Sequence, residues 1–200
     1  ALLGQPGVAV VGSRSVDAEG EACAEFIGSA CAKAGFVLYS GGARGVDSLS
    51  AQASLDVRGT AVGILANSLE QAVRPPETRA ALSRGDLALA TPYGPDAGFS
   101  VGAAMGRNRL IYTLADYAIV VASDAEKGGT WAGATEALKA KWVPVFVLNG
   151  PTVPEGNRRL LEKGGIAFSV SSLTASLSLR DWLNAHVVDS EPPLVQAKLF

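Results

Sequence analysis

The feature that most constrains this chain is an alternation between short runs rich in β-branched residues and longer stretches with helical periodicity. Residues 7–12 form the first such run, and residues 17–34 follow with apolar side chains every three or four positions. Strands that are continuous apolar runs, each joined to the next through a helix, are typical of a parallel sheet covered on both faces. The pattern therefore predicts an α/β fold with a doubly wound, Rossmann-like and mainly parallel sheet.

The same alternation continues along the chain to residue 168. We expect further strands over residues 36–40, 60–66, 87–90, 117–122, 143–148 and 166–168. We expect further helices over residues 46–57, 77–83, 99–115, 130–141 and 155–163. Beyond this point come a serine-rich stretch, a short leucine-rich helix and a tail with two prolines. The sequence thus predicts a Rossmann-like domain over residues 1–168 and a C-terminal arm over residues 169–200.

Composition excludes several classes of protein. Of the 200 residues, 48% are hydrophobic and 18% are charged, so the chain can bury a core and is not of the disordered class. With one histidine and two cysteines, we expect neither a metal site nor a disulfide framework. No apolar run approaches the length of a membrane span. We expect a cytoplasmic protein without a membrane contact and without a cofactor.

Charge and glycine content together indicate what kind of binding is available. The formal net charge of -2 predicts no broad attraction to nucleic acid or to anionic lipid. Several of the 23 glycines fall at predicted strand-to-helix turns, where backbone amides can bind an anion. In a doubly wound sheet, ligands bind beyond the carboxyl ends of the strands and at helix N-termini. Four segments of this chain fall at such positions.

The first segment, residues 12–15, follows the first strand. Gly12 permits a sharp turn, Ser13 can donate a hydrogen bond to an anion, and Arg14 adds a positive charge. A plain helix cap beside a solvated arginine explains this motif equally well.

The second segment, residues 40–47, follows the second strand and carries the clearest signal. Its glycines allow successive backbone N–H groups to converge on an oxyanion, and Arg44 adds a planar group suited to phosphate. Asp47 would repel a phosphate at the same point, so it suits a sugar hydroxyl or holds Arg44 in place. A structural glycine turn is the alternative, since the ending of a phosphate-binding P-loop is missing. The candidate phosphate ligands here are Ser40, Gly41, Gly42, Arg44, Gly45 and Asp47.

The third segment lies on the predicted helix over residues 99–115. Arg107 and Arg109 flank Asn108, and the three side chains could hold a phosphate and a base edge together. A solvated basic face of the helix is the alternative interpretation.

The fourth segment, residues 127–130, leads into the predicted helix over residues 130–141. Gly128 and Gly129 permit close approach of a ligand, and Thr130 is a natural helix N-cap as well as a candidate phosphate ligand. Glu136 lies further along this helix, where a glutamate is more often a surface residue.

In this order, the segments resemble the Rossmann domain of the DprA/Smf DNA-processing proteins, within a wider group that includes the LOG-type phosphoribohydrolases. The resemblance covers residues 6–150 and is carried by the Gly-Gly-Ala-Arg-Gly-Val-Asp run at 41–47 together with Arg-Asn-Arg at 107–109. This chain differs from the family at Ala51, where a histidine is common. It also has Ala122 or Ser123 where the family has an acidic residue.

The resemblance implies a protein that binds single-stranded DNA, acts in DNA processing and recombination, forms a homodimer and helps to load a recombinase. By this resemblance, Arg44 and the turn at residues 41–42 would contact DNA phosphates, and Arg107 and Arg109 would lie near the same groove. No catalytic residue is then expected, and the scarcity of histidine also favours binding over catalysis.

Two alternatives remain open from the sequence. One is a LOG-like phosphoribohydrolase or nucleotide sensor that holds a free nucleotide in the same cleft. Residues 127–136 are similar to the Pro-Gly-Gly-x-Gly-Thr…Glu segment of the LOG-type enzymes, and Glu136 would then be the glutamate that assists cleavage. The other alternative is a scaffold that retains the fold without binding or catalysis.

Overall fold

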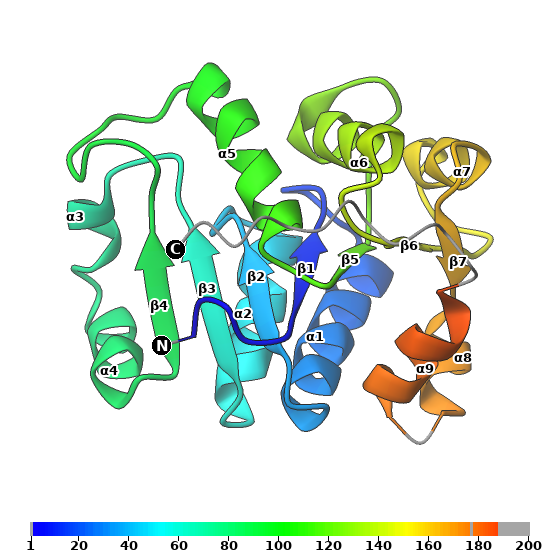
Figure 1. Ribbon diagram of the computed structural model, residues 1–200, viewed down its shortest axis with the longest axis horizontal. Helices are drawn as coiled ribbons and strands as arrows, with labels where there is room; N and C mark the ends of the chain where they lie inside the picture. The colour runs from blue at the N-terminus through cyan, green and yellow to red at the C-terminus, as the bar shows by residue number, and fades with distance from the viewer. Residues whose placement is uncertain (1, 177, 188–200) are drawn as a thin grey trace.

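Seven strands of the described residues form one parallel sheet. The computed structural model describes residues 2–176 and 178–187. The strand order is β4-β3-β2-β1-β5-β6-β7, and each neighbouring pair is parallel (Figure 1). The strands are β1 (Gly7–Val11), β2 (Val37–Ser40), β3 (Thr60–Ile64), β4 (Leu87–Ala90), β5 (Tyr117–Val120), β6 (Val145–Leu148) and β7 (Ile166–Phe168). The predicted doubly wound, Rossmann-like fold is confirmed.

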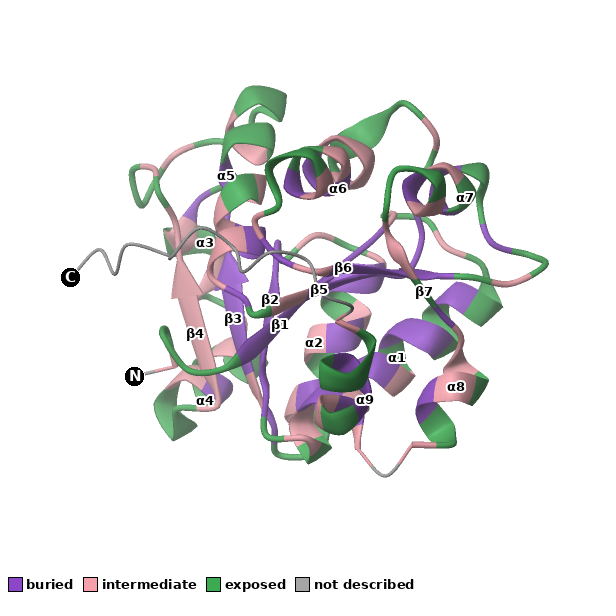
Figure 2. Cartoon of the chain, turned by 45° about the vertical axis from the view of Figure 1, so that its right-hand side comes forward, coloured by how far each residue is buried: buried purple, intermediate pink, exposed green. Residues whose placement is uncertain are grey.

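Helices cover both faces of this sheet, as Figure 2 shows. On one face lie α1 (Ala18–Lys33), α2 (Val46–Asp56), α8 (Val170–Thr174) and α9 (Leu179–His186). On the other face lie α5 (Val101–Thr113), α6 (Gly128–Ala140) and α7 (Glu155–Glu162). Two further helices, α3 (Leu69–Ala72) and α4 (Pro76–Arg84), belong to the connection from β3 to β4. Within the described residues, no helix has the length and apolar character needed to cross a bilayer.

The core consists of two apolar clusters, one on each face of the sheet. The first joins α1 and α9 to side chains of β1, β2 and β6, and the second joins α5, α6 and α7 to the opposite side of the same strands. Every residue of β1, β2 and β6 is buried, because these strands are apolar runs that meet helices on both sides. The edge strand β4 is only partly buried.

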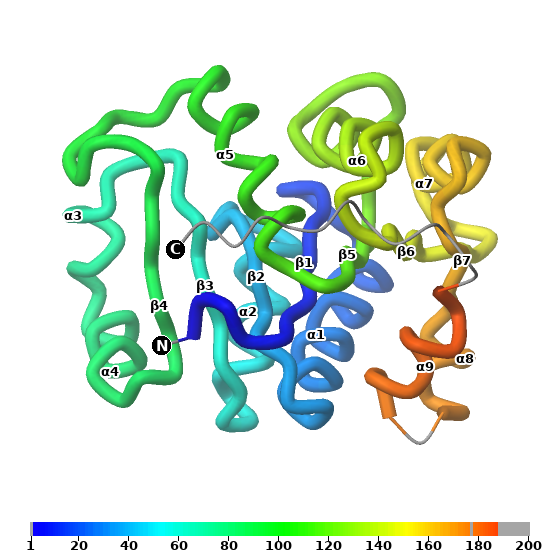
Figure 3. Tube along the Cα trace, viewed as in Figure 1, coloured from blue at the N-terminus to red at the C-terminus, as the bar shows by residue number. Residues whose placement is uncertain are grey.

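The described part of the predicted C-terminal arm packs against the first cluster. Leu179, Trp182 and Leu183 of α9 are buried there, and the Trp182 ring lies 5.5 Å from that of Phe146 in β6. The trace in Figure 3 shows α8 and α9 following β7 directly. The rest of the predicted arm, residues 188–200 with its two prolines, lies outside the described residues.

The direction in which strands are added to the sheet reverses at β1. Strands β2, β3 and β4 extend from one side of β1, and β5, β6 and β7 extend from the other. The connections that follow β1 and β5 therefore diverge and leave a crevice beyond their carboxyl ends, the usual ligand site in open α/β sheets.

Candidate functional site

A cavity of about 390 Å³ lies at this switch point between β1 and β5. Its walls come from the loops after β1, β2 and β5, from α5 and from the first turn of α6. The predicted site residues that line it are Gly12, Ser13, Arg14, Asp47, Arg107, Asn108, Gly128, Gly129 and Thr130. Four segments separated in sequence thus contribute to one site, as their placement after parallel strands predicts.

The remaining predicted residues lie outside the lining of this cavity: Ser40, Gly41, Gly42, Arg44, Gly45 and Arg109. Ser40 is buried at the end of β2, whereas Arg44 is exposed on the β2–α2 turn. Glu136, the candidate of the hydrolase alternative, is exposed on α6 and is not part of the cavity wall.

The β2–α2 turn packs directly against the loop that follows β1. Gly45 has a φ of 79°, and a Cβ atom there would lie 2.4 Å from the carbonyl oxygen of Ser13. A side chain would therefore be both strained and in collision, so glycine is required for this approach. The amide of Val46 donates to the same Ser13 carbonyl, at 3.3 Å.

The buried carboxylate of Asp47 binds backbone amides of the β2–α2 turn. Its Oδ2 accepts a hydrogen bond from the amide of Gly41 at 2.9 Å, and the amides of Gly12 and Ala43 also stabilise the carboxylate. In the described structure no hydrogen bond or ion pair joins Asp47 to Arg44, so of the two alternatives for Asp47 the one in which it holds Arg44 in place is wrong. The physical reason is that backbone amides of Gly12, Gly41 and Ala43 already bind the buried carboxylate, whereas the Arg44 side chain is exposed to solvent.

Arg107 lies at the inner end of the cavity, with 6% of its surface exposed. Its Nη1 donates to the carbonyl of Gly41 at 2.6 Å and to that of Ile64, so the side chain ties α5 to the ends of β2 and β3. Burial lowers the pKa of Arg107, while the nearby Asp47 opposes that shift. Burial likewise raises the pKa of Asp47 from 3.8 to about 6 against the effect of Arg107 and the amides.

The two arginines of the Arg-Asn-Arg motif point to different sides of α5. Residues two apart on a helix are separated by about 200° around its axis. Arg109 is accordingly exposed outside the cavity, with its guanidinium 5.3 Å from the centre of the Trp142 ring. Asn108 stays on the cavity side and donates from Nδ2 to the carbonyl of Gly129 at 3.0 Å.

The mouth of the cavity combines positive charge with exposed apolar side chains. The guanidinium of Arg14 lies 5.3 Å from the centre of the Phe99 ring, and both residues line the cavity. Phe99 is 54% exposed, and Met105, on the first half of α5, is 41% exposed. Sequence reasoning missed these two residues, because apolar side chains beside a helix are normally assigned to the core.

The first turn of α6 faces the same cavity. The helix begins at Gly128, and its N-cap is Lys127, whose side chain makes no capping hydrogen bond. The predicted start at Thr130, with Thr130 as the cap, is therefore wrong by two residues, because extended backbone ends at Lys127. The amides at the start of a helix have no partner within it and carry partial positive charge, so an uncapped first turn favours an anion.

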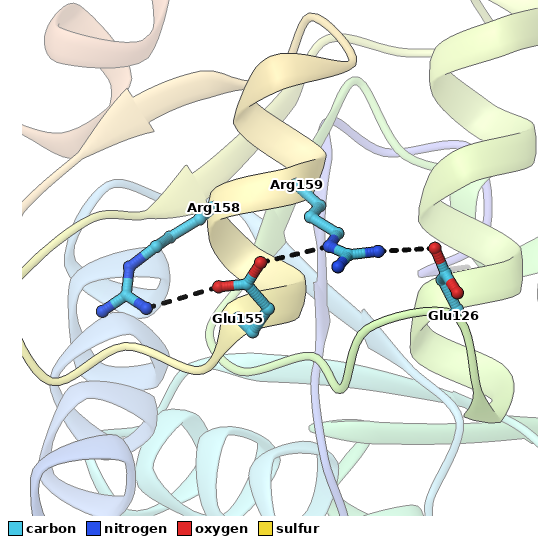
Figure 4. Close-up of polar contacts among 4 residues, drawn as sticks. All are labelled: Glu126, Glu155, Arg158 and Arg159. Carbon is cyan, nitrogen blue, oxygen red and sulfur yellow. Dashed lines mark hydrogen bonds and ion pairs between the residues drawn. The ribbon is translucent and has the colours of Figure 1, made fainter.

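Two sets of contacts anchor the β5–α6 loop that precedes this turn. Figure 4 shows Arg159 of α7 between Glu155 and Glu126, with Arg158 on the far side of Glu155. These ion pairs are exposed and so contribute little each. The buried amide of Asn157 supplies the firmer anchor: it accepts from the amide of Ser123 at 2.8 Å and donates to the carbonyls of Val121 and Leu148, both at 2.9 Å.

One acidic side chain near this loop was not predicted to belong to the site. Asp124 follows β5 and lines the cavity. Its place just after a strand was the available signal, and the family comparison had pointed to the two preceding residues instead. Asp124 is exposed whereas Asp47 is buried beside Arg107, so the exposed part of the lining carries the two cations Arg14 and Lys127 against one carboxylate.

Comparison with known proteins identifies the family. The family model for DNA recombination-mediator protein A matches residues 1–179. The chain belongs to this family. Among the curated proteins, none matches the chain.

Solved structures agree with this assignment. DNA processing protein A from Streptococcus pneumoniae is 24% identical with a TM-score of 0.72; the match covers 88% of this chain and 62% of that protein. DNA processing protein A from Helicobacter pylori, described for its single-stranded DNA binding mode, is 26% identical with a TM-score of 0.70, over 92% of this chain and 81% of that one. The present chain thus spans less than two thirds of the streptococcal protein.

A second group of structures shares the fold alone. The molybdenum cofactor carrier protein from Chlamydomonas reinhardtii is 20% identical with a TM-score of 0.56, over 86% of this chain and 99% of that one.

Proposed function

We propose that this chain binds single-stranded DNA as part of DNA processing and recombination, with a backbone phosphate held at the mouth of the cavity. The observation that carries the proposal is the convergence of Arg14, Lys127 and the uncapped first turn of α6 beside the exposed Phe99. Cationic side chains and helix N-termini bind phosphate, and exposed aromatic rings stack on bases. Both features meet at this one mouth.

The arrangement favours a single strand over a duplex. A base can stack on the Phe99 ring only when it is free of its own neighbours in a double helix, as in single-strand binding sites. Arg14 already lies over that ring, so its charge and the ring together offer one surface to a nucleotide. The role of Phe99 thus complements that of the phosphate ligands.

Arg44 extends the proposed path beyond the cavity. It is exposed on the β2–α2 turn, and among the described residues its side chain makes no hydrogen bond or ion pair. The turn itself borders the cavity through Ala43. We assign Arg44 to a neighbouring phosphate of the same strand. The glycines of the turn then have a structural role, because they allow the backbone shape that exposes Arg44.

Fluorescence anisotropy with a labelled oligothymidylate at low salt tests the proposal. We expect Arg14→Ala to weaken binding about tenfold or more, as loss of a charged hydrogen bond does. Phe99→Ala should weaken it by about 1–3 kcal/mol, the usual contribution of one stacked base. Arg79→Ala is the matched control, because Arg79 is exposed on α4, away from the carboxyl edge of the sheet.

Two results would overturn the proposal: no binding by the unmodified chain at low salt, or equal losses for Arg14→Ala and Arg79→Ala. A free nucleotide is the second candidate ligand, because the cavity volume falls within the usual range for small-molecule sites. Competition by AMP at the same affinity as the oligonucleotide would favour that candidate. Release of free base, abolished by Glu136→Ala, would favour the hydrolase, although Glu136 lies outside the cavity.

Family membership supports three further parts of the proposal: a homodimer, delivery of the bound strand to a recombinase, and action in the cytoplasm. The homodimer is the part most directly accessible to measurement. Sedimentation equilibrium should give twice the mass of the 20.4 kDa chain. A monomer at all concentrations would remove the dimer from the proposal and leave DNA binding untouched.

A further inference from the structure

Three buried polar atoms in the described part of the chain lack a hydrogen-bond partner: Arg107 Nε, the Tyr112 hydroxyl and Thr135 Oγ1. Folded proteins pair nearly all of their buried polar groups, so each exception calls for an explanation. Arg107 and Tyr112 both line the cavity, whereas Thr135 does not. Two of the three unpaired groups therefore belong to one wall of the candidate site.

Both residues lie on α5, at the inner end of the cavity. Arg107 uses Nη1 to hold the carbonyls of Gly41 and Ile64, which leaves the Nε–H group without a partner. Tyr112 is 2% exposed, and its ring lies against α6 at Gly133, where a Cβ atom would come within 2.9 Å of the tyrosine Cε2. Glycine at that position permits the close approach of ring and helix.

Asn108 lines the same wall of the cavity as Tyr112. It precedes Tyr112 by one turn of α5 and bonds to Gly129, which precedes Gly133 by one turn of α6. One hydrogen bond of 3.0 Å holds the Asn108 amide in this position.

Charge separates the inner end from the mouth. At the inner end, Asp47 lies near Arg107, so the two charges compensate each other. At the mouth, Arg14 and Lys127 are exposed, and no ion pair engages them within the described residues. A phosphate is therefore favoured at the mouth and disfavoured beside Asp47, whereas the inner end suits a neutral hydrogen-bond acceptor.

We propose that the inner end of the cavity is a subsite for one nucleobase, in which the unpaired Tyr112 hydroxyl and the unpaired Arg107 Nε–H donate hydrogen bonds to acceptors on the polar edge of the base. The edge of a base presents carbonyl oxygens and ring nitrogens that can accept such bonds. This inference rests on the proposed function, because the phosphate of the same strand occupies the mouth. This subsite recognises the polar edge of a base, whereas the mouth of the cavity contacts only the DNA phosphate and the flat face of a base.

The test compares a labelled oligothymidylate with an equally long strand of abasic sugar-phosphates. Tyr112→Phe keeps the ring in its place against α6 and removes only a hydroxyl that is unpaired in the free protein. Loss of one hydrogen bond should lower the affinity for oligothymidylate about two- to tenfold and leave the affinity for the abasic strand unchanged. Thr135→Val is the control, because it removes the unpaired hydroxyl that lies outside the cavity, and it should change neither affinity.

Each result decides between the base subsite and a purely structural tyrosine. The proposal is overturned if Tyr112→Phe leaves the affinity for oligothymidylate unchanged, or lowers both affinities equally. Retained binding of the abasic strand also reports that the variant is folded. Failure of the proposed function would look different, since the unmodified chain would then bind neither strand.

Discussion

The side chains at the inner end of this cavity are positioned by backbone groups more than by opposite charges. Asp47 accepts a hydrogen bond from the Gly41 amide, and Arg107 donates to backbone carbonyls at the ends of β2 and β3. These hydrogen bonds fix the orientation of each side chain as well as its position. They also keep charged groups away from water, with consequences for their titration.

Asp47 should make the stability of the fold depend on pH. Burial raises its pKa from 3.8 to about 6, so between these values the folded state holds a proton that the unfolded chain has released. The resulting stabilisation is fully present below about pH 4 and is lost as pH rises through about 6. A difference of about two pH units corresponds to about 3 kcal/mol.

Urea unfolding at pH 4 and pH 7 measures this effect, with Asp47→Asn as the reference that cannot titrate at this position. The parent chain should lose about 2 kcal/mol more of its unfolding free energy between these pH values than Asp47→Asn does, because at pH 4 the unfolded chain is still partly protonated. An equal change in the two proteins would contradict the prediction. A larger gain with rising pH in the parent would mean that Arg107 and the amides outweigh burial.

At the scale of elements, the strands and long helices were predictable because each depends on a pattern within its own sequence. β4 and β7 match their predicted ranges, and α6 differs by two residues at its start. α3 and α8 were not predicted, because four or five residues are too few to show helical periodicity. The packing of side chains between elements has no comparable pattern in the local sequence. The position of Phe99 at the cavity mouth depends on such packing and was therefore not predictable.

The candidate site was predictable to the same extent. Strand order places the turns after β1, β2 and β5 at one edge, so the grouping of residues 12–14, 47 and 128–130 followed from the fold. The direction of side chains did not follow: the sequence grouped Arg109 with Arg107 at one ligand, whereas helical geometry sets Arg109 on another side of α5, outside the cavity. The unpaired Tyr112 hydroxyl depends on the contact between α5 and α6, which the sequence does not specify.

Helix α9 should contribute to the stability of the whole sheet. Trp182 is 7% exposed and lies against Phe146 of the central part of the fold. Trp182→Ala should lower the unfolding free energy by about 3–5 kcal/mol, as truncation of a buried aromatic side chain does. Denaturant unfolding measures the loss. His186→Ala is the control, since that ring stacks on Trp182 at 4.0 Å but is exposed; equal losses for the two variants would contradict the prediction.

At the scale of the whole molecule, the charge distribution limits how DNA can be bound. A net charge of -2 offers no basic surface over which a strand could spread. The cations that the proposed path uses are Arg14, Arg44 and Lys127, all exposed at the carboxyl edge of the sheet. Binding should therefore depend on a few local phosphate contacts.

The salt dependence of single-strand binding tests this directly. Each phosphate neutralised on a single strand contributes about 0.7 to the slope of log affinity against log salt, so three contacts predict a slope of about −2. Affinity should then fall about 20-fold between 50 and 200 mM salt, because the release of counterions from the DNA is less favourable at the higher salt concentration. Arg44→Ala should reduce the slope by about 0.7, whereas Arg79→Ala should leave it unchanged. A slope of about −5 or steeper in the parent would instead require a wide basic surface, and the described charges of this chain do not provide one.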